Sequence, residues 1–259
     1  MKDYTVSVCI VTYNSKAIIE RTIKSIFEFT KGVRLDFFVV DNASSDGTAE
    51  FIRSRFPEIT VLENEKNIGF GAAHNKVLPL LRSKYHIVVN PDIILKSNAV
   101  LTLCDYADEH DDVGLLSPQV RFDDGRIQQL GKRNPSFRYL GSHWFHKGDE
   151  PSKTMIEYCM LDCPTDRPTE ISNATGCFMF FRTETFRELS GFDERFFMYL
   201  EDCDIARRVS ESKKFKALFF PQAEVTHLWE RESKRNKKLL AVHIRSIISY
   251  FLKWGIKLW

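Results

Sequence analysis

Acidic side chains follow two of the apolar segments in this chain. Asp41 comes directly after the apolar run 35–40, and Asp92 follows the run 86–89 through Asn90 and Pro91. Asp41 is able to accept hydrogen bonds from a nucleobase N–H or a ribose hydroxyl, and equally able to form a turn or cap a helix. Pro91 stiffens the turn before Asp92 and would aim that carboxylate outward, which suits a divalent cation. A simple turn is the alternative for Asp92.

Two adjacent acids, Glu201 and Asp202, lie between the aromatic stretch 196–199 and a predicted helix. They could simply favour the positive end of the helix dipole. Beside bulky side chains they would also be partly desolvated, which raises the basicity that a proton acceptor needs. His227, in a short apolar segment, is either a metal ligand or a structural histidine.

The elements that must position these residues alternate between strand and helix through the first half of the chain. Such alternation with short connections predicts a parallel sheet covered by helices. Ligands of these sheets bind beyond the carboxyl ends of the strands, where Thr12, Asn14, Asp41 and Asp92 lie. The predicted strands are 5–11, 35–40, 60–62 and 86–89, and the predicted helices are 17–29, 48–55 and 72–81.

The second half has a different character. Residues 132–170 are rich in Pro, Gly, Asp and aromatics, which indicates a flexible loop or a small subdomain. We expect residues 1–230 to form one domain, with a nucleotide-sugar-binding half (1–112) and an acceptor and catalytic half (113–230). Further strands are predicted at 114–120, 178–181, 217–220 and 225–228, a hairpin turn at 122–126 and a helix at 205–211.

Residues 231–259 are predicted to form a C-terminal helix whose first part is basic and whose second part is apolar. A cluster of lysines and arginines (Arg231, Lys234, Arg235, Lys237, Lys238) precedes a mostly apolar stretch with two tryptophans. The stretch is too short and too charged to span a bilayer. It suits an interfacial helix on anionic lipid, or a helix packed on its own domain or on a partner subunit.

Bulk composition excludes several classes. The 259 residues, 43% hydrophobic and 28% charged, fit one α/β domain with an appended segment, and a net charge of +2 gives no reason to expect nucleic acid. The six cysteines fall mostly in apolar runs, and no signal-peptide pattern is visible. We expect a cytoplasmic protein, in peripheral contact with the inner face of the cell membrane if the tail binds lipid. The segment 67–71 is not a dinucleotide fingerprint, and the sequence contains no P-loop.

An ordered series of short motifs spans about residues 5–229, and it resembles glycosyltransferase family 2, in particular its bacterial rhamnosyltransferase-like branch. The series consists of Val8-Cys9-Ile10-Val11-Thr12-Tyr13-Asn14, Val39-Val40-Asp41-Asn42-Ala43-Ser44-Ser45-Asp46-Gly47-Thr48, Asn67-Ile68-Gly69-Phe70-Gly71-Ala72-Ala73-His74-Asn75, Asn90-Pro91-Asp92, Ala174-Thr175-Gly176-Cys177-Phe178, Gly191-Phe192-Asp193-Glu194-Arg195-Phe196-Phe197, Tyr199-Leu200-Glu201-Asp202-Cys203-Asp204 and His227.

The resemblance implies a GT-A fold, which is an α/β fold. Its Rossmann-like, mostly parallel sheet is flanked by helices, with a smaller acceptor-side mixed sheet and a C-terminal helix. Asp41 would bind the nucleoside of a nucleotide-sugar donor, with Thr12 and Asn14 near the base. The residues that would shape the donor pocket are Asn67, Gly69 and Asn75.

The resemblance also implies roles for the acids. Asp92 would be the last acid of a metal-binding Asp-x-Asp motif whose first position is Asn90 here, and His227 would be a second ligand of Mn²⁺ or Mg²⁺. Asp202 would be the catalytic base, with Glu201 beside it for acceptor or sugar contacts. The implied reaction is inverting transfer of a hexose, with rhamnose favoured, from a dTDP- or UDP-linked donor. The acceptor would be a glycan or lipid-linked glycan of a cell-surface polysaccharide.

Two other classes compete with this interpretation. A nucleotidyltransferase shares the nucleotide-binding core, but it usually carries a glycine-rich loop with a basic residue after the first strand, where this chain has Thr12-Tyr13-Asn14-Ser15. A non-catalytic sugar-nucleotide-binding scaffold would have no need of Asp92, Glu201 and Asp202 together.

Overall fold

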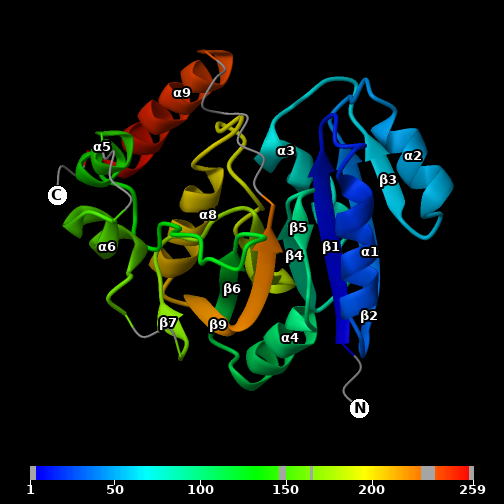
Figure 1. The fold of residues 1–259 in the computed structure, drawn as a ribbon, viewed down its shortest axis with the longest axis horizontal. Coiled ribbons are helices and arrows are strands. Elements are labelled where there is room, and N and C mark those ends of the chain that lie inside the picture. Colours follow the sequence, from blue (N-terminus) through cyan, green and yellow to red (C-terminus); the bar gives the residue numbers. More distant parts are fainter. Residues whose placement is uncertain (1–3, 146–149, 164–165, 229–236, 257–259) are drawn as a thin grey trace.

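The computed structural model describes residues 4–145, 150–163, 166–228 and 237–256, and one nine-stranded sheet runs through this part of the chain (Figure 1). The strands are β1 (Tyr4–Thr12), β2 (Val33–Asp41), β3 (Thr60–Glu63), β4 (Tyr85–Val89), β5 (Ile93–Ile94), β6 (Val113–Arg121), β7 (Thr169–Glu170), β8 (Phe178–Arg182) and β9 (Lys216–His227). Their order is β3-β2-β1-β4-β8-β6-β9-β5, with β7 paired to β9.

The first half is the parallel sheet that the sequence predicts. Strands β3, β2, β1 and β4 are all parallel, so their carboxyl ends meet at one edge. The helices that follow them are α1 (Ile19–Phe29), α2 (Thr48–Arg55), α3 (Phe70–Asn75) and α4 (Ala99–Glu109). The predicted α/β class and GT-A arrangement are confirmed.

Both faces of the sheet are buried, which explains the continuous apolar runs of its strands. On one face, Val8 and Ile10 of β1 pack with Ile23 of α1 and Leu103 of α4. On the other face, Cys9 packs in a second cluster that includes α3, α7 (Thr183–Glu188) and α8 (Glu201–Glu211). Helix α8, from the second half of the chain, is therefore fixed to the same sheet as the strands of the first half.

The second half extends the same sheet. Strand β8 runs antiparallel to both β4 and β6, and so joins the two halves. The predicted strands 217–220 and 225–228 are one strand, β9. Its pairing with β6 shifts between Phe220, opposite Pro118, and Glu224, opposite Gln119. Pro221 lies in this irregularity, where a residue without an N–H is tolerated.

Two predicted features differ in detail. The helix expected over 72–81 ends at Asn75 and continues as a 3₁₀ turn, Leu78–Leu80, around Pro79. Residues 132–170 contain the helices α5 (Phe137–Phe145) and α6 (Lys153–Cys159). Ser152 caps α6 by accepting a hydrogen bond from the Met155 N–H at 3.2 Å.

The C-terminal helix α9 (Lys237–Trp254) packs with one face on α8 and the segment before it. Lys253 forms ion pairs of 2.7 Å with both Asp193 and Asp204, and Trp254 donates a 2.8 Å hydrogen bond to Asp204. Figure 1 shows α9 grouped with α5 and α6, on the side of the molecule opposite α1 and α2. Residues 231–236 and 257–259 of the predicted tail lie outside the described residues.

Within the described ranges, no helix is both long enough and apolar enough to cross a membrane. All six cysteines are free.

Candidate active site

The carboxylate of Asp41 is buried at the end of β2 and holds the loop that follows. Thr12, its neighbour in the parallel register, donates a 2.8 Å hydrogen bond to Oδ1. Ser44 donates two more, from its hydroxyl to Oδ1 at 2.6 Å and from its N–H to Oδ2 at 2.7 Å. A carboxylate offers about four lone-pair sites, so capacity for a ligand remains.

Asn14 connects this loop to the one after β1. It lies in the left-handed region with φ of 52°, which asparagine tolerates better than most residues. Its Oδ1 accepts a 2.8 Å hydrogen bond from the Ser45 N–H, and its own N–H donates to Ser44 Oγ at 2.8 Å. The side chain of Asn14 is exposed, so the two loops present a fixed polar edge.

Asn42, for which no role is predicted from the sequence, is buried beneath the loops at the ends of β2 and β3. Its amide donates to the Gly69 carbonyl at 3.1 Å and accepts from Asn64 at 2.9 Å. Asn67 accepts from the Gly69 N–H at 3.0 Å. These bonds join the ends of β2 and β3 to the start of α3. A buried amide next to Asp41 that can bond in four directions is the signal that could have revealed this residue.

Gly69 meets the backbone that leads to the acidic pair. Its φ is +92°, and a Cβ placed on it would lie 2.1 Å from the carbonyl oxygen of Phe197. The next residue, Phe70, donates its N–H to that same carbonyl at 2.8 Å. Only glycine permits this approach, so the donor-side loop and the segment before Glu201 touch here.

Asn75, at the end of α3, holds this helix to the segment 191–194 through hydrogen bonds. Its amide donates to the Phe192 carbonyl and accepts from the Phe192 N–H, both at 2.8 Å. It also donates to Glu194 at 3.1 Å. Thr12, Asn14, Asp41, Asn67 and Gly69 therefore belong to the loops at the strand ends, whereas Asn75 ties α3 to the segment 191–194.

Asp92 and His227 are brought together by the pairing of β5 with β9. Ile93 lies opposite His227, and the Leu228 N–H donates to the Asp92 carbonyl at 3.0 Å. His227 Nε2 lies 3.2 Å from Asp92 Oδ2. Gln128 Oε1 accepts a hydrogen bond from His227 Nδ1–H at 3.1 Å and its amide N–H donates to the His227 carbonyl at 3.0 Å, so it fixes the imidazole.

The donor set of this pair fits a divalent cation. An imidazole nitrogen and a carboxylate oxygen are ligand types that divalent cations bind, and in the neutral tautomer with Nδ1–H toward Gln128 the Nε2 lone pair is directed to the Asp92 side. Neighbouring ligands of an octahedral ion with bonds of about 2.1 Å lie roughly 3 Å apart, close to the observed separation. The described residues contain no group of three His, Cys, Asp or Glu side chains, so a ligand other than these would complete the shell.

The backbone of Gly176 and Cys177 connects this pair to Asp202. The Cys177 carbonyl accepts from the Asn90 N–H at 2.9 Å, and the Gly176 N–H donates to Asp202 Oδ2 at 2.8 Å. A Cβ at Gly176 would lie 3.2 Å from the Cβ of Asp202. The structure thus brings Asp92, His227 and Asp202 to the start of β8.

Glu201 and Asp202 begin α8 in different environments. Asp202 accepts hydrogen bonds from the N–H groups of Gly176 and Cys203, each at 2.8 Å. Glu201 is buried, and its Oε2 has no hydrogen-bond partner among the residues that the structure describes. Burial raises the pKa of both carboxyls, and with the charge of Asp202 it raises the pKa of Glu201 to about 8. The two backbone N–H groups favour the ionised form of Asp202, whereas burial and the charge of Asp202 favour the protonated form of Glu201.

The two residues before this pair have left-handed backbones. Tyr199 has φ of 73° and Leu200 has φ of 67°. Bulky residues rarely adopt this conformation, which costs roughly 1–3 kcal/mol each and concentrates at functional sites. The sequence offers no sign of it, because neither residue is glycine or asparagine. Gly176 and Gln128 were likewise without a predicted role, although Gly176 falls in a motif of the series.

The fold is that of nucleotide-sugar glycosyltransferases. The mannosyltransferase PcManGT from Pyrobaculum calidifontis, in complex with GDP-Man and Mn²⁺, superposes with a TM-score of 0.67 at 18% identity over 95% of this chain and 64% of that one. GalNAc-T7 with UDP, GalNAc and Mn²⁺ also gives 0.67, at 16% identity over 95% of this chain and 48% of that one. The chain thus spans less than two thirds of each of these proteins.

Sequence similarity identifies the family to which the chain belongs. The model of glycosyl transferase family 2 matches residues 7–190, and the chain belongs to that family. It is 28% identical over 254 residues to the N-acetylglucosaminyl-diphospho-decaprenol L-rhamnosyltransferase of Mycobacterium tuberculosis, covering 91% of this chain and 80% of the relative. The predicted likeness to the rhamnosyltransferase branch is confirmed.

Replacing Glu201 with Gln tests where the proton lies. Because the folded pKa is raised to about 8 from an ordinary value of 4.5, wild type loses stability as pH rises from about 4.5 to about 8. We expect E201Q to lack this loss. The unfolding free energy of E201Q minus that of wild type should therefore increase as pH rises across that window. Urea unfolding at several pH values measures the difference, with the exposed Glu58→Gln as control. A constant difference between E201Q and wild type would contradict the assignment.

Proposed function

We propose that this protein is an inverting, metal-dependent rhamnosyltransferase that uses a nucleotide diphosphate donor, dTDP-rhamnose in preference to UDP-sugars. The acceptor is N-acetylglucosamine carried on a lipid diphosphate, an intermediate of cell-surface polysaccharide. The observation that carries the chemistry is the position of Asp202, held by two backbone N–H groups beside the Asp92–His227 pair. The M. tuberculosis relative supports the choice of sugar and acceptor.

In the proposed reaction Asp202 takes the proton of an acceptor hydroxyl as that oxygen attacks the anomeric carbon. The bond from this carbon to the diphosphate oxygen breaks on the opposite face, so one displacement inverts the configuration. Asp92 and His227 would hold a divalent cation, which neutralises the charge that develops on the departing diphosphate. Protonated Glu201 adds no second negative charge beside the base.

Asp41 and the loop that it orders take the nucleoside in this proposal. Thr12 and Ser44 keep the carboxylate fixed, so hydrogen bonding to a base or ribose costs little ordering. Asn14, Asn67 and Gly69 shape the rest of the donor pocket, and Asn75 holds α3 in place behind it.

The Asp202→Asn substitution is the main test of the proposed base. We expect turnover with dTDP-rhamnose and the lipid-linked acceptor to fall by roughly two to four orders of magnitude, the usual contribution of a positioned base. The matched control is Asp111→Asn, at a side chain that is 98% exposed. Proton NMR of the wild-type product should show the anomeric configuration opposite to that of the donor. Near-normal turnover of folded D202N, or retention of configuration, would rule out this mechanism.

The Asp92→Ala substitution tests the metal pair through binding instead of activity. Calorimetry should show that wild type binds dTDP at least about tenfold more tightly with Mn²⁺ than with chelator, and that D92A has no metal dependence. Gln128→Ala removes both hydrogen bonds that hold His227 but leaves Asp92 in place, and it should weaken the metal effect less than D92A does. Equal affinity with and without Mn²⁺ in wild type would remove the metal from the proposal.

We also propose peripheral membrane contact through the C-terminal helix, which would keep the enzyme beside a lipid-linked acceptor at the inner face of the membrane. Support comes from the basic residues at 231–238 and the exposed apolar side chains Leu240, Ile244 and Ile248 of α9.

Vesicle sedimentation tests this contact. Each basic residue near an anionic surface contributes about 1 kcal/mol, so the double variant Lys234→Glu, Lys237→Glu should bind phosphatidylglycerol vesicles at least about tenfold more weakly than wild type. Lys66→Glu reverses an exposed charge elsewhere and should bind as wild type does. Equal sedimentation of wild type with anionic and with phosphatidylcholine vesicles would contradict the electrostatic contact.

A further inference from the structure

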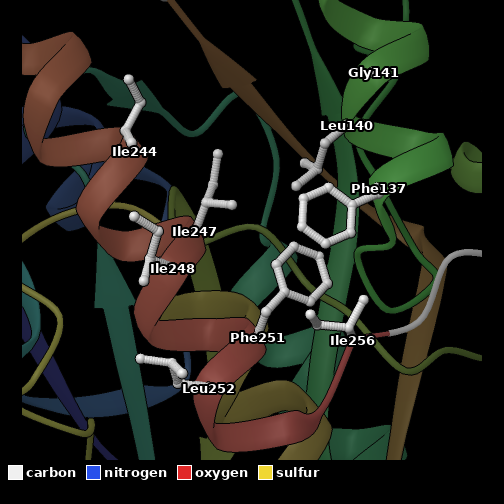
Figure 2. A pocket seen from close by; sticks show the side chains of 9 residues that line it. All are labelled: Phe137, Leu140, Gly141, Ile244, Ile247, Ile248, Phe251, Leu252 and Ile256. Atoms are coloured by element: carbon white, nitrogen blue, oxygen red, sulfur yellow. The ribbon is translucent and has the colours of Figure 1, made fainter.

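An apolar groove of about 700 Å³ lies between α5 and α9. Figure 2 shows Ile247 and Phe251 of α9 pointing toward Phe137 and Leu140 of α5. The rings of Phe137 and Phe251 are stacked with centroids 4.3 Å apart. All nine lining residues are apolar or glycine. Contiguous apolar surface of this kind marks an interaction site.

Much of the groove wall is exposed. Ile248 is 55% exposed and Leu252 is 81% exposed, although both belong to a helix whose other face is firmly packed. Each Å² of apolar surface left in water forgoes roughly 25 cal/mol. A bound apolar partner would recover this free energy.

The inner wall of the groove is part of the packing behind the catalytic acids. Leu140, Ile247 and Phe251 form one apolar cluster with Phe196, Leu200 and Cys203, which flank Glu201 and Asp202 in the sequence. Ser246 of α9 also donates a 2.8 Å hydrogen bond to the Met198 carbonyl. A molecule in the groove is therefore held against the same framework as the base.

We propose that this groove holds the hydrocarbon chain of the lipid-linked acceptor. The inference rests on the proposed function. It assigns a binding site to the hydrocarbon part of the acceptor, which the proposed base does not contact. A protein–protein interface typically surrounds its apolar core with a polar rim. The groove offers only hydrocarbon, and the chain before α9 supplies the basic residues that complement an anionic lipid.

Gly141 gives the groove its width on the α5 side. A Cβ placed on Gly141 meets no atom within 4 Å, so the residue has no packing reason to be glycine. Glycine inside a helix costs roughly 0.5–1 kcal/mol relative to alanine. A larger side chain would fill the groove without straining α5, which makes Gly141→Leu a variant that folds.

The experiment compares one acceptor head group on two chains. N-acetylglucosamine diphosphate is linked either to decaprenol or to a water-soluble butyl group, and transfer is followed in the same detergent buffer. We expect Gly141→Leu and Ile248→Asn to raise KM for the decaprenyl acceptor by roughly tenfold or more, as the loss of a few buried methylenes requires. Both variants should leave KM and kcat for the butyl acceptor within about twofold of wild type, and Leu80→Asn, an exposed apolar residue outside the groove, should change neither.

The outcomes separate this inference from the proposed function. Transfer by wild type to neither acceptor refutes the function itself. Wild-type transfer with the same KM for both acceptors leaves the function standing and overturns the groove assignment. The groove assignment is also overturned if the two variants raise KM equally for both acceptors. If sedimentation shows that wild type is a dimer and that the variants are monomers, the groove binds a second copy of this chain.

Discussion

The backbone of Gly176 and Cys177 fixes the relative position of Asp202 and the turn before Asp92. One hydrogen bond from this stretch reaches the turn before Asp92, and the next reaches the carboxylate of Asp202. The first is a backbone–backbone bond of 2.9 Å and the second joins a backbone N–H to a side-chain carboxylate at 2.8 Å, so both acids are tied to the start of β8. Strand β8 is in turn antiparallel to β4 and β6. The spacing of the Asp92–His227 pair and Asp202 therefore depends on the sheet and not on a loop.

The charges around this stretch are balanced by different means. Asp202 keeps its negative charge because two backbone N–H groups solvate it, whereas buried Glu201 holds a proton. Asp92 faces an imidazole whose other nitrogen is bound by Gln128. One carboxylate is thus ready to take a proton, one is neutral, and one is suited to a cation. Three equivalent carboxylates so close together would each raise the others' pKa, and no single group would serve as base at neutral pH.

The sequence predicts the parallel half well because its signals are local. Apolar runs such as 35–40 and the turn at 44–48 define β2 and α2 without knowledge of the fold. The union of 217–220 with 225–228 into β9 depends on the partner strand β6 and could not be seen from the residues around Pro221. The candidate residues at strand ends were found for the same local reason. Gln128 and Asn42 were missed because their roles come from partners 99 and 27 residues away.

The backbone conformation just before Glu201 and Asp202 depends most on contacts that are distant in the sequence. Tyr199 and Leu200 adopt left-handed conformations that neither residue favours, so the rest of the fold must supply the stabilisation. Leu200 packs in the cluster built by α5 and α9, and Phe197 on the other side is clamped by Gly69 and Phe70. Any molecule that packs against Phe251 therefore also packs on the cluster that supports the backbone before Asp202. The loop that contains Gly69 contacts the same backbone at Phe197. Asp202 is consequently coupled to the loop at Gly69 and to the groove between α5 and α9 through one strained segment of a few residues.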